Sequence, residues 1–113
     1  MAVLVQTPSP NQLLQTIRGA IDQGHIKTWT YDRDGDFTHT PDQWRGKAWL
    51  RPVAQNGTLK FGIIGPNQAS ISKAVYGVYH GRWIEELLTH FDTVVGNISA
   101  TPLPVHGLDS VAA

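Results

Sequence analysis

Residues 72–91 read SKAVYGVYHGRWIEELLTHF, and the spacing of their apolar side chains changes near His80. After this point the apolar residues recur at the spacing of one helix face: Trp83, Ile84, Leu87, Leu88 and Phe91. Before it, the side chains are of the β-branched or aromatic types that suit a half-buried strand: Val75, Tyr76, Val78 and Tyr79. We therefore expect a strand that ends at His80 and a helix that follows Gly81, with one continuous helix from residue 70 as the alternative.

The rest of the chain predicts one more helix and four more strands. Residues 12–21 carry apolar side chains at helical spacing, and Gly24 ends that segment. Alternating side chains predict strands over residues 26–31, 37–40, 47–53 and 58–64. Asn56-Gly57 is expected to join the last two strands as a tight hairpin, because both residue types tolerate positive φ.

These elements predict a two-layer α+β domain over residues 1–96. An antiparallel sheet of about four or five strands would carry the N-terminal and the C-terminal helix on one face, since each helix has a single apolar stripe. The opposite face of the sheet is then exposed or covered by a partner. Residues 97–113 contain Pro102, Pro104 and Gly107, and we expect them to form a loosely ordered tail.

The composition excludes several classes of protein. No apolar run approaches the roughly 18 residues that a membrane helix needs. The absence of cysteine excludes a disulfide framework, a thiol nucleophile and a zinc-thiolate site. Residues 1–5 are apolar but lack the basic segment of a secretory signal. We therefore expect a soluble cytoplasmic protein that does not enter a membrane, and we predict no cofactor.

Charge is unevenly distributed along the chain, although the formal net charge is zero. Residues 43–84 carry six cationic side chains and no acidic one. If Trp29, Trp49 and Arg51 share one face of the sheet, rings and cations would lie side by side, as in proteins that bind single-stranded nucleic acid. The competing interpretation is that the tryptophans fill the core. Even partial exposure of Trp29 and Trp49 would make a surface suited to a protein partner.

An acidic segment precedes this basic one. Asp32, Asp34 and Asp36 alternate in a predicted turn, and hard cations such as Ca²⁺ prefer clustered carboxylates of this kind. However, Phe37 and Gln43 occupy the positions at which a helix-loop-helix calcium site has its glycine and its bidentate glutamate. A solvated hairpin turn is therefore the favoured interpretation, and the three aspartates are only weak candidates for metal ligands.

A third candidate site is His80-Gly81-Arg82, at the predicted junction of strand and helix. The start of a helix offers free amide hydrogens, so Arg82 and His80 there would suit a carboxylate or phosphate. His39 is a possible second imidazole and Asp36 a possible orienting carboxylate for acid-base chemistry. No sequence spacing enforces this arrangement, and structural roles for these residues are the competing interpretation.

Three segments also suggest a relationship: WTYDRDGDFTHTPDQW at residues 29–44, AWLRP at residues 48–52 and YHGRWIEELLTHFD at residues 79–92. They resemble segments of a family of small, uncharacterised bacterial proteins. The resemblance covers roughly residues 13–92. It implies a soluble bacterial protein, and it supplies neither an activity nor a catalytic residue.

The favoured functional hypothesis is a non-enzymatic domain that binds a protein partner or its own copy. Its binding residues would be Trp29, Trp49, Arg51 and Arg82. The alternatives are a nucleic-acid binder that uses residues 43–84, and an enzyme or small-anion binder at His80-Gly81-Arg82.

Overall fold

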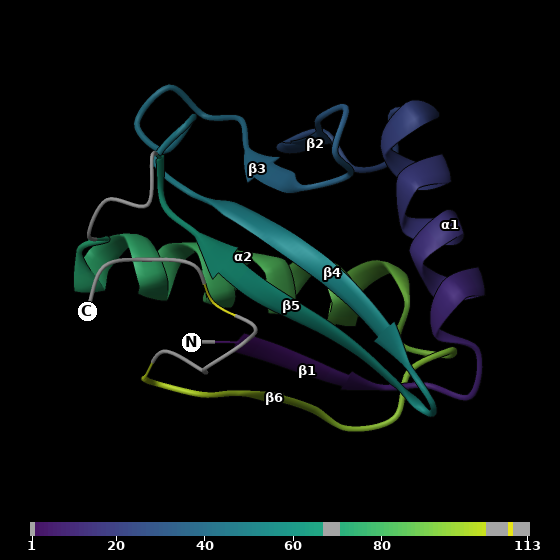
Figure 1. Cartoon of the computed structure of the whole chain (residues 1–113). Helices are drawn as coiled ribbons and strands as arrows, with labels where there is room; N and C mark the ends of the chain where they lie inside the picture. The colour runs from purple at the N-terminus through teal and green to yellow at the C-terminus, as the bar shows by residue number, and fades with distance from the viewer. Residues whose placement is uncertain (1, 67–70, 104–108, 110–113) are drawn as a thin grey trace.

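The computed structural model describes residues 2–66, 71–103 and 109, and these residues form six strands and two helices (Figure 1). In chain order the elements are β1 (Ala2–Gln6), α1 (Pro10–Asp22), β2 (Trp29–Tyr31), β3 (Phe37–His39), β4 (Trp49–Gln55), β5 (Thr58–Ile64), α2 (Lys73–His90) and β6 (Ile98–Ala100). The structure therefore confirms an α+β fold. Within the described part of the chain, no helix is both long enough and apolar enough to cross a membrane.

The strands form one antiparallel sheet in the order β2-β3-β4-β5-β1-β6. The predicted Asn56-Gly57 hairpin joins β4 to β5, and Gly57 has a φ of 73°, which glycine adopts without steric cost. The sheet has six strands rather than four or five because β1 and β6 were not predicted. Both strands pair with partners that are distant in sequence: Val3 lies opposite Phe61 of β5 and Ala100 of β6.

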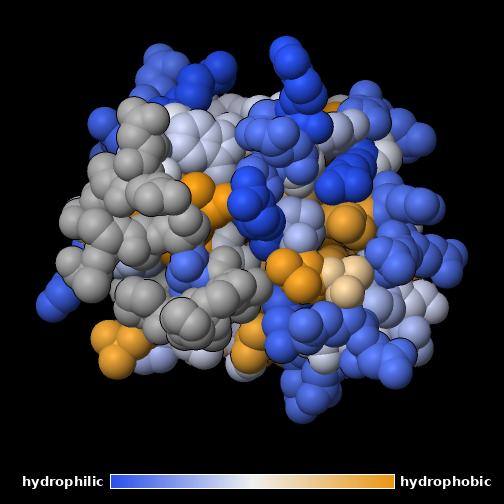
Figure 2. All heavy atoms as spheres, in the orientation of Figure 1, coloured by the Kyte–Doolittle hydropathy of each residue, from blue (hydrophilic) through white to orange (hydrophobic). Residues whose placement is uncertain are grey.

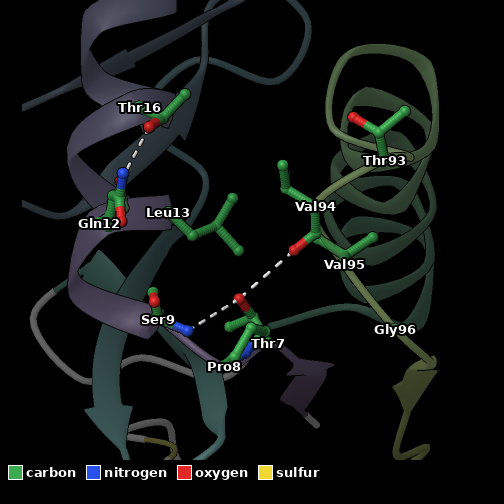
Figure 3. A pocket seen from close by; sticks show the side chains of 10 residues that line it. All are labelled: Thr7, Pro8, Ser9, Gln12, Leu13, Thr16, Thr93, Val94, Val95 and Gly96. Atoms are coloured by element: carbon green, nitrogen blue, oxygen red, sulfur yellow. Dashed lines mark hydrogen bonds between the residues drawn. The ribbon is translucent and has the colours of Figure 1, made fainter.

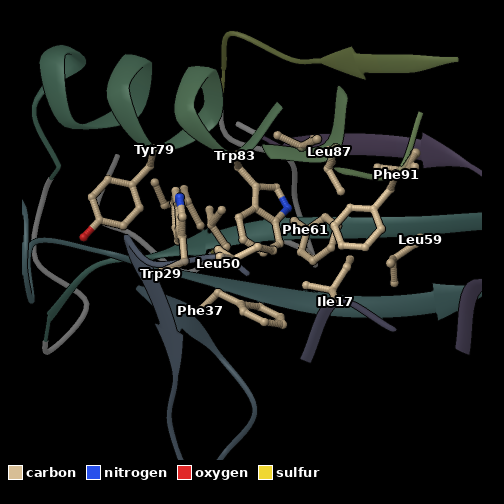
Figure 4. Close-up of a cluster of buried hydrophobic side chains, with 14 of the residues drawn as sticks. Ile17, Trp29, Phe37, Leu50, Leu59, Phe61, Tyr79, Trp83, Leu87 and Phe91 are labelled. Atoms are coloured by element: carbon tan, nitrogen blue, oxygen red, sulfur yellow. The ribbon is translucent and has the colours of Figure 1, made fainter. Parts of the chain in front are cut away.

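One hydrophobic cluster joins the sheet to the helices (Figure 4). Its centre is Trp83 of α2, which is 1% exposed and contacts three aromatic rings of the sheet. The ring centroids lie 4.7 Å from Trp29, 4.9 Å from Phe37 and 5.2 Å from Phe61. Leu13 and Ile17 of α1 belong to the same cluster. Tilted and edge-to-face contacts such as these add to the hydrophobic stabilisation that burial itself provides.

Helix α2 is continuous from Lys73 to His90, so the strand predicted over residues 72–80 is wrong and the alternative of a long helix is right. Ser72 caps the helix: its side chain accepts a hydrogen bond from the amide of Val75 at 3.2 Å. The buried residues of α2 follow one helical stripe: Tyr76, Tyr79, His80, Trp83 and Leu87. Tyr79 lies one turn before Trp83 and therefore on the same face, where its hydroxyl donates to the carbonyl of Trp44 at 2.5 Å.

Part of the predicted tail lies within the described residues. It contains β6, which pairs with β1, and Asp109, whose Oδ1 accepts a hydrogen bond from the amide of Ile63 at 2.7 Å. The remaining residues of that prediction, 104–108 and 110–113, lie outside the described residues.

Candidate binding surface on the sheet

The two faces of the sheet differ in what covers them. Leu50, Phe61 and Ile63 point to the core and are fully buried. The intervening residues of β4 and β5 point the other way, because side chains alternate along a strand. We call this side the outer face and define it by Leu4, Trp49, Arg51, Val53, Lys60 and Ile64. The strand register places Trp49 opposite Ile64, Val53 opposite Lys60, and Lys60 opposite Leu4.

The outer face combines apolar and cationic side chains. Trp49, Val53, Leu4 and Ile64 are half-buried, as is Lys60, while the Arg51 side chain is 53% exposed. In Figure 1 the strands β4 and β5 pass in front of α2, so Figure 2, in the same orientation, looks onto this face. Figure 2 shows hydrophobic atoms between hydrophilic side chains there. Half-buried apolar side chains beside cations are the pattern of a surface that can bind a partner.

Arg51 is held in place by Asp36. Its Nε donates to Asp36 Oδ1 at 3.0 Å and its Nη2 donates to Oδ2 at 2.9 Å. This two-point, charge-assisted contact is among the stronger hydrogen-bonded ion pairs, and it raises the pKa of the Arg51 guanidinium. The Asp36 side chain is 6% exposed, so Arg51 supplies the counter-charge that a buried carboxylate needs.

The three aspartates of the predicted metal site do lie together, with ligand atoms within 4.8 Å of one another. Each has another explanation in the turn. Asp32 Oδ1 accepts hydrogen bonds from the amides of Asp34 and Asp36, both at 3.0 Å, and Gly35 takes a positive φ of 85°. Both oxygens of Asp36 bind Arg51. These bonds explain the positions of the Asp32 and Asp36 carboxylates in the turn.

Trp29 and Arg82, which were also predicted to bind a partner, do not belong to the outer face. Trp29 is 2% exposed, and it packs on the core side against His39 and Tyr79 at centroid distances of 4.6 and 5.5 Å. Arg82 is exposed, but on α2, in the other layer of the domain. Of the predicted partner-binding residues, Trp49 and Arg51 therefore share the candidate surface.

The site at His80-Gly81-Arg82 was predicted at the start of a helix, but these residues lie inside α2. Their backbone amides are not the free amides of a helix start. His80 is 7% exposed, and its Nδ1 lies 2.9 Å from the carbonyl oxygen of Tyr76. It lines a groove of about 770 Å³ between α2 and residues 100–103.

His39 is 1% exposed and lies beneath Trp29 rather than in that groove. Its Nδ1 is 2.7 Å from the carbonyl of Thr28, which can only accept, so Nδ1 carries the proton. Burial lowers the pKa of His39, and the nearby positive charge of Arg82 lowers it further. A neutral imidazole enclosed in this way is suited to packing, because acid-base catalysis requires contact with a substrate.

Comparison with known proteins does not assign this chain to a family. No protein-family model matches the chain. No curated protein and no solved structure matches it either. The resemblance to a bacterial family therefore remains a prediction from three sequence segments.

The sequence predicted Trp49 and Arg51 as binding residues but did not predict the apolar neighbours that complete the outer face. The alternation of β5 did set Lys60 apart from Leu59 and Phe61. Nothing local in the sequence places Leu4 beside Lys60, because that contact depends on the pairing of β1 with β5.

Proposed function

We propose that this chain is a non-enzymatic cytoplasmic domain that binds a protein partner, or a second copy of itself, on the outer face around Trp49. The observation that carries the proposal is a half-buried tryptophan among half-buried aliphatic side chains on the outer face. Tryptophan is enriched among the residues that dominate binding energy at protein interfaces. The exposed Arg51 is suited to the polar rim of such an interface.

The position of the two helices supports this choice of face. Arg18 of α1 lies over the ring of Phe37 at 5.8 Å, and Trp83 of α2 lies 4.9 Å from the same ring. Phe37 is fully buried in the core cluster. Both helices therefore contact this one core side chain, which supports the proposal that a partner binds the opposite face of the sheet.

The test compares Trp49→Arg with Leu88→Arg. Leu88 is an exposed apolar residue on α2, at 55% exposure, and so provides a matched change away from the outer face. Each immobilised variant and the unmodified protein would capture partners from native cell extract for identification by mass spectrometry, and light scattering would measure self-association. We expect Trp49→Arg to lose a partner or a dimer that Leu88→Arg keeps. Identical captured sets together with a monomer for all three proteins would refute the proposal.

Nucleic acid is the second candidate, because Trp49, Arg51 and Lys60 share the outer face. Proteins that bind single strands combine aromatic rings, on which bases stack, with cationic side chains that attract the phosphates. The expected signature is binding of a labelled oligonucleotide that weakens as salt concentration rises and that Lys60→Ala also weakens. Absence of binding at low salt would exclude this alternative.

A further inference from the structure

A cleft of about 460 Å³ lies at one end of the sheet, away from the residues of the outer face (Figure 3). One wall is the first half of α1, including Gln12, Leu13 and Thr16. The facing wall is the segment 93–96, which connects α2 to β6. A volume of this size lies within the range of small-molecule sites, about 300–1,000 Å³.

The start of α1 and two hydrogen bonds fix the positions of the two walls. Pro10 starts α1, and its fixed φ suits the first helical position. On the other side, Gly96 donates its amide to the carbonyl of Gln6 at 2.7 Å, which fastens the segment to the end of β1. The base of the cleft is spanned by Thr7, whose hydroxyl donates to the carbonyl of Val94 at 3.4 Å (Figure 3). Above this contact the space between the walls is open to solvent.

The lining of the cleft contains hydroxyl, amide and apolar side chains and no charged one among the described residues. The sequence explains this, because the first charged residue of the chain is Arg18 and residues 93–108 carry no charge. An ionic ligand would lose part of its hydration here without gaining a side-chain counter-charge. A neutral ligand does not meet this cost.

The lining offers both polar and apolar groups, which suits a ligand that is polar along its edge and apolar on its face. The side chains of Ser9, Gln12 and Thr93 are exposed, so their donors and acceptors are available to a ligand. Leu13, which is 4% exposed, and Val94, which is 50% exposed, supply apolar contact. Together they match a molecule with hydroxyl groups along its edge and C–H groups on its face.

We propose that this cleft is a second binding site, for a small neutral molecule that carries several hydroxyl groups, of the chemical class of monosaccharides. The ligand's hydroxyl groups exchange hydrogen bonds with Ser9, Gln12 and Thr93, and its C–H face lies on Leu13 and Val94. This site shares no residue with the outer face, so its test does not depend on the proposed function.

The test is a titration of the isotope-labelled protein, followed through its amide resonances. The probes are a neutral methyl glucoside, and glucuronate and glucosamine as anionic and cationic counterparts of the same ring size. We expect saturable shifts at residues 7–16 and 93–96 with the glucoside, and affinities at least about tenfold weaker for both charged probes. Non-saturable shifts, shifts centred elsewhere, or equal affinity for a charged probe would overturn the proposal.

A pair of variants on α1 adds a second measurement. Gln12→Glu places a carboxylate in the lining, whereas Gln15→Glu makes the same change at an exposed position of α1 outside it. Both positions are exposed and such surface changes usually have little effect on stability, so both variants should fold. We expect Gln12→Glu to weaken glucoside binding about fivefold or more, and Gln15→Glu to leave it unchanged. Equal affinity of the two variants would show that the cleft is not the binding site.

Discussion

The continuity of α2 predicts that two of its glycines can be replaced with a gain in stability. Gly77 and Gly81 lie inside the helix on its exposed side, and neither has a positive φ. Apart from the adjacent residues and the backbone of the helix itself, no atom of the described residues lies within 4 Å of a Cβ added at either position. Alanine therefore fits both sites, and it restricts the unfolded chain more than glycine does.

The size of the gain follows from helix propensity. Glycine is about 0.8–1.0 kcal/mol less favourable than alanine inside a helix. The double variant Gly77→Ala/Gly81→Ala should therefore raise the free energy of unfolding by about 1.5–2 kcal/mol. For a domain of this size, 1 kcal/mol corresponds to about 4–6 °C in Tm, so we expect an increase of about 6–12 °C.

Urea denaturation followed by circular dichroism would measure the free energy, and calorimetry the Tm. Gly57→Ala is the control: its φ of 73° is unfavourable for alanine, so this variant should lose stability. If residues 72–80 were a strand and Gly81 its junction with a helix, alanine would not stabilise either position. A double variant that is no more stable than the unmodified protein would therefore refute the continuous helix.

Three further outcomes are expected. In a urea titration, Asp36→Asn should lower the free energy of unfolding by about 1–2 kcal/mol, because it weakens the contact with Arg51. Addition of Ca²⁺ to the unmodified protein should not raise its Tm, and a clear calcium-dependent increase would contradict this. Tyr79→Phe should cost about 1–2 kcal/mol because the Trp44 carbonyl loses this buried hydrogen bond and keeps the one from the Lys47 amide; an unchanged unfolding midpoint would contradict this. Burial lowers the pKa of His39, so the unfolded chain binds this proton at a higher pH than the folded one, and the free energy of unfolding should fall as the pH drops below about 6.5. His39→Phe should reduce the slope of the free energy of unfolding against pH. An equal slope for both proteins would refute the lowered pKa of His39.

The parts of the fold that the sequence predicted are those that neighbouring residues determine. Asn56-Gly57 places two strands next to each other through one turn, and the alternation of β5 identifies Leu59, Phe61 and Ile63 as the core side. Helix α1 follows from the spacing of its apolar residues. By contrast, β1 and β6 are defined by pairing with distant strands, and no turn signal accompanies such pairing.

The error over residues 72–80 has a different cause. Tyr76 and Tyr79 are typical of strands, and counting them as strand residues hid their helical spacing with Trp83. The hydroxyl group of Tyr79 donates a hydrogen bond to the Trp44 carbonyl, which allows this tyrosine to be buried in a helix. Leu88, which the apolar spacing assigned to the core, is instead 55% exposed.

By itself, the sequence determined the α+β class, the central hairpin, the first helix and the candidate roles of Trp49 and Arg51. Tertiary structure alone decided that Trp29 is in the core while Trp49 is on the outer face, and that Leu4 lies beside Lys60. It also decided that uncharged residues near both ends of the chain form one cleft. The physical reason is that residue type and spacing set local conformation, whereas the face that a strand buries and the elements that meet depend on packing between distant segments.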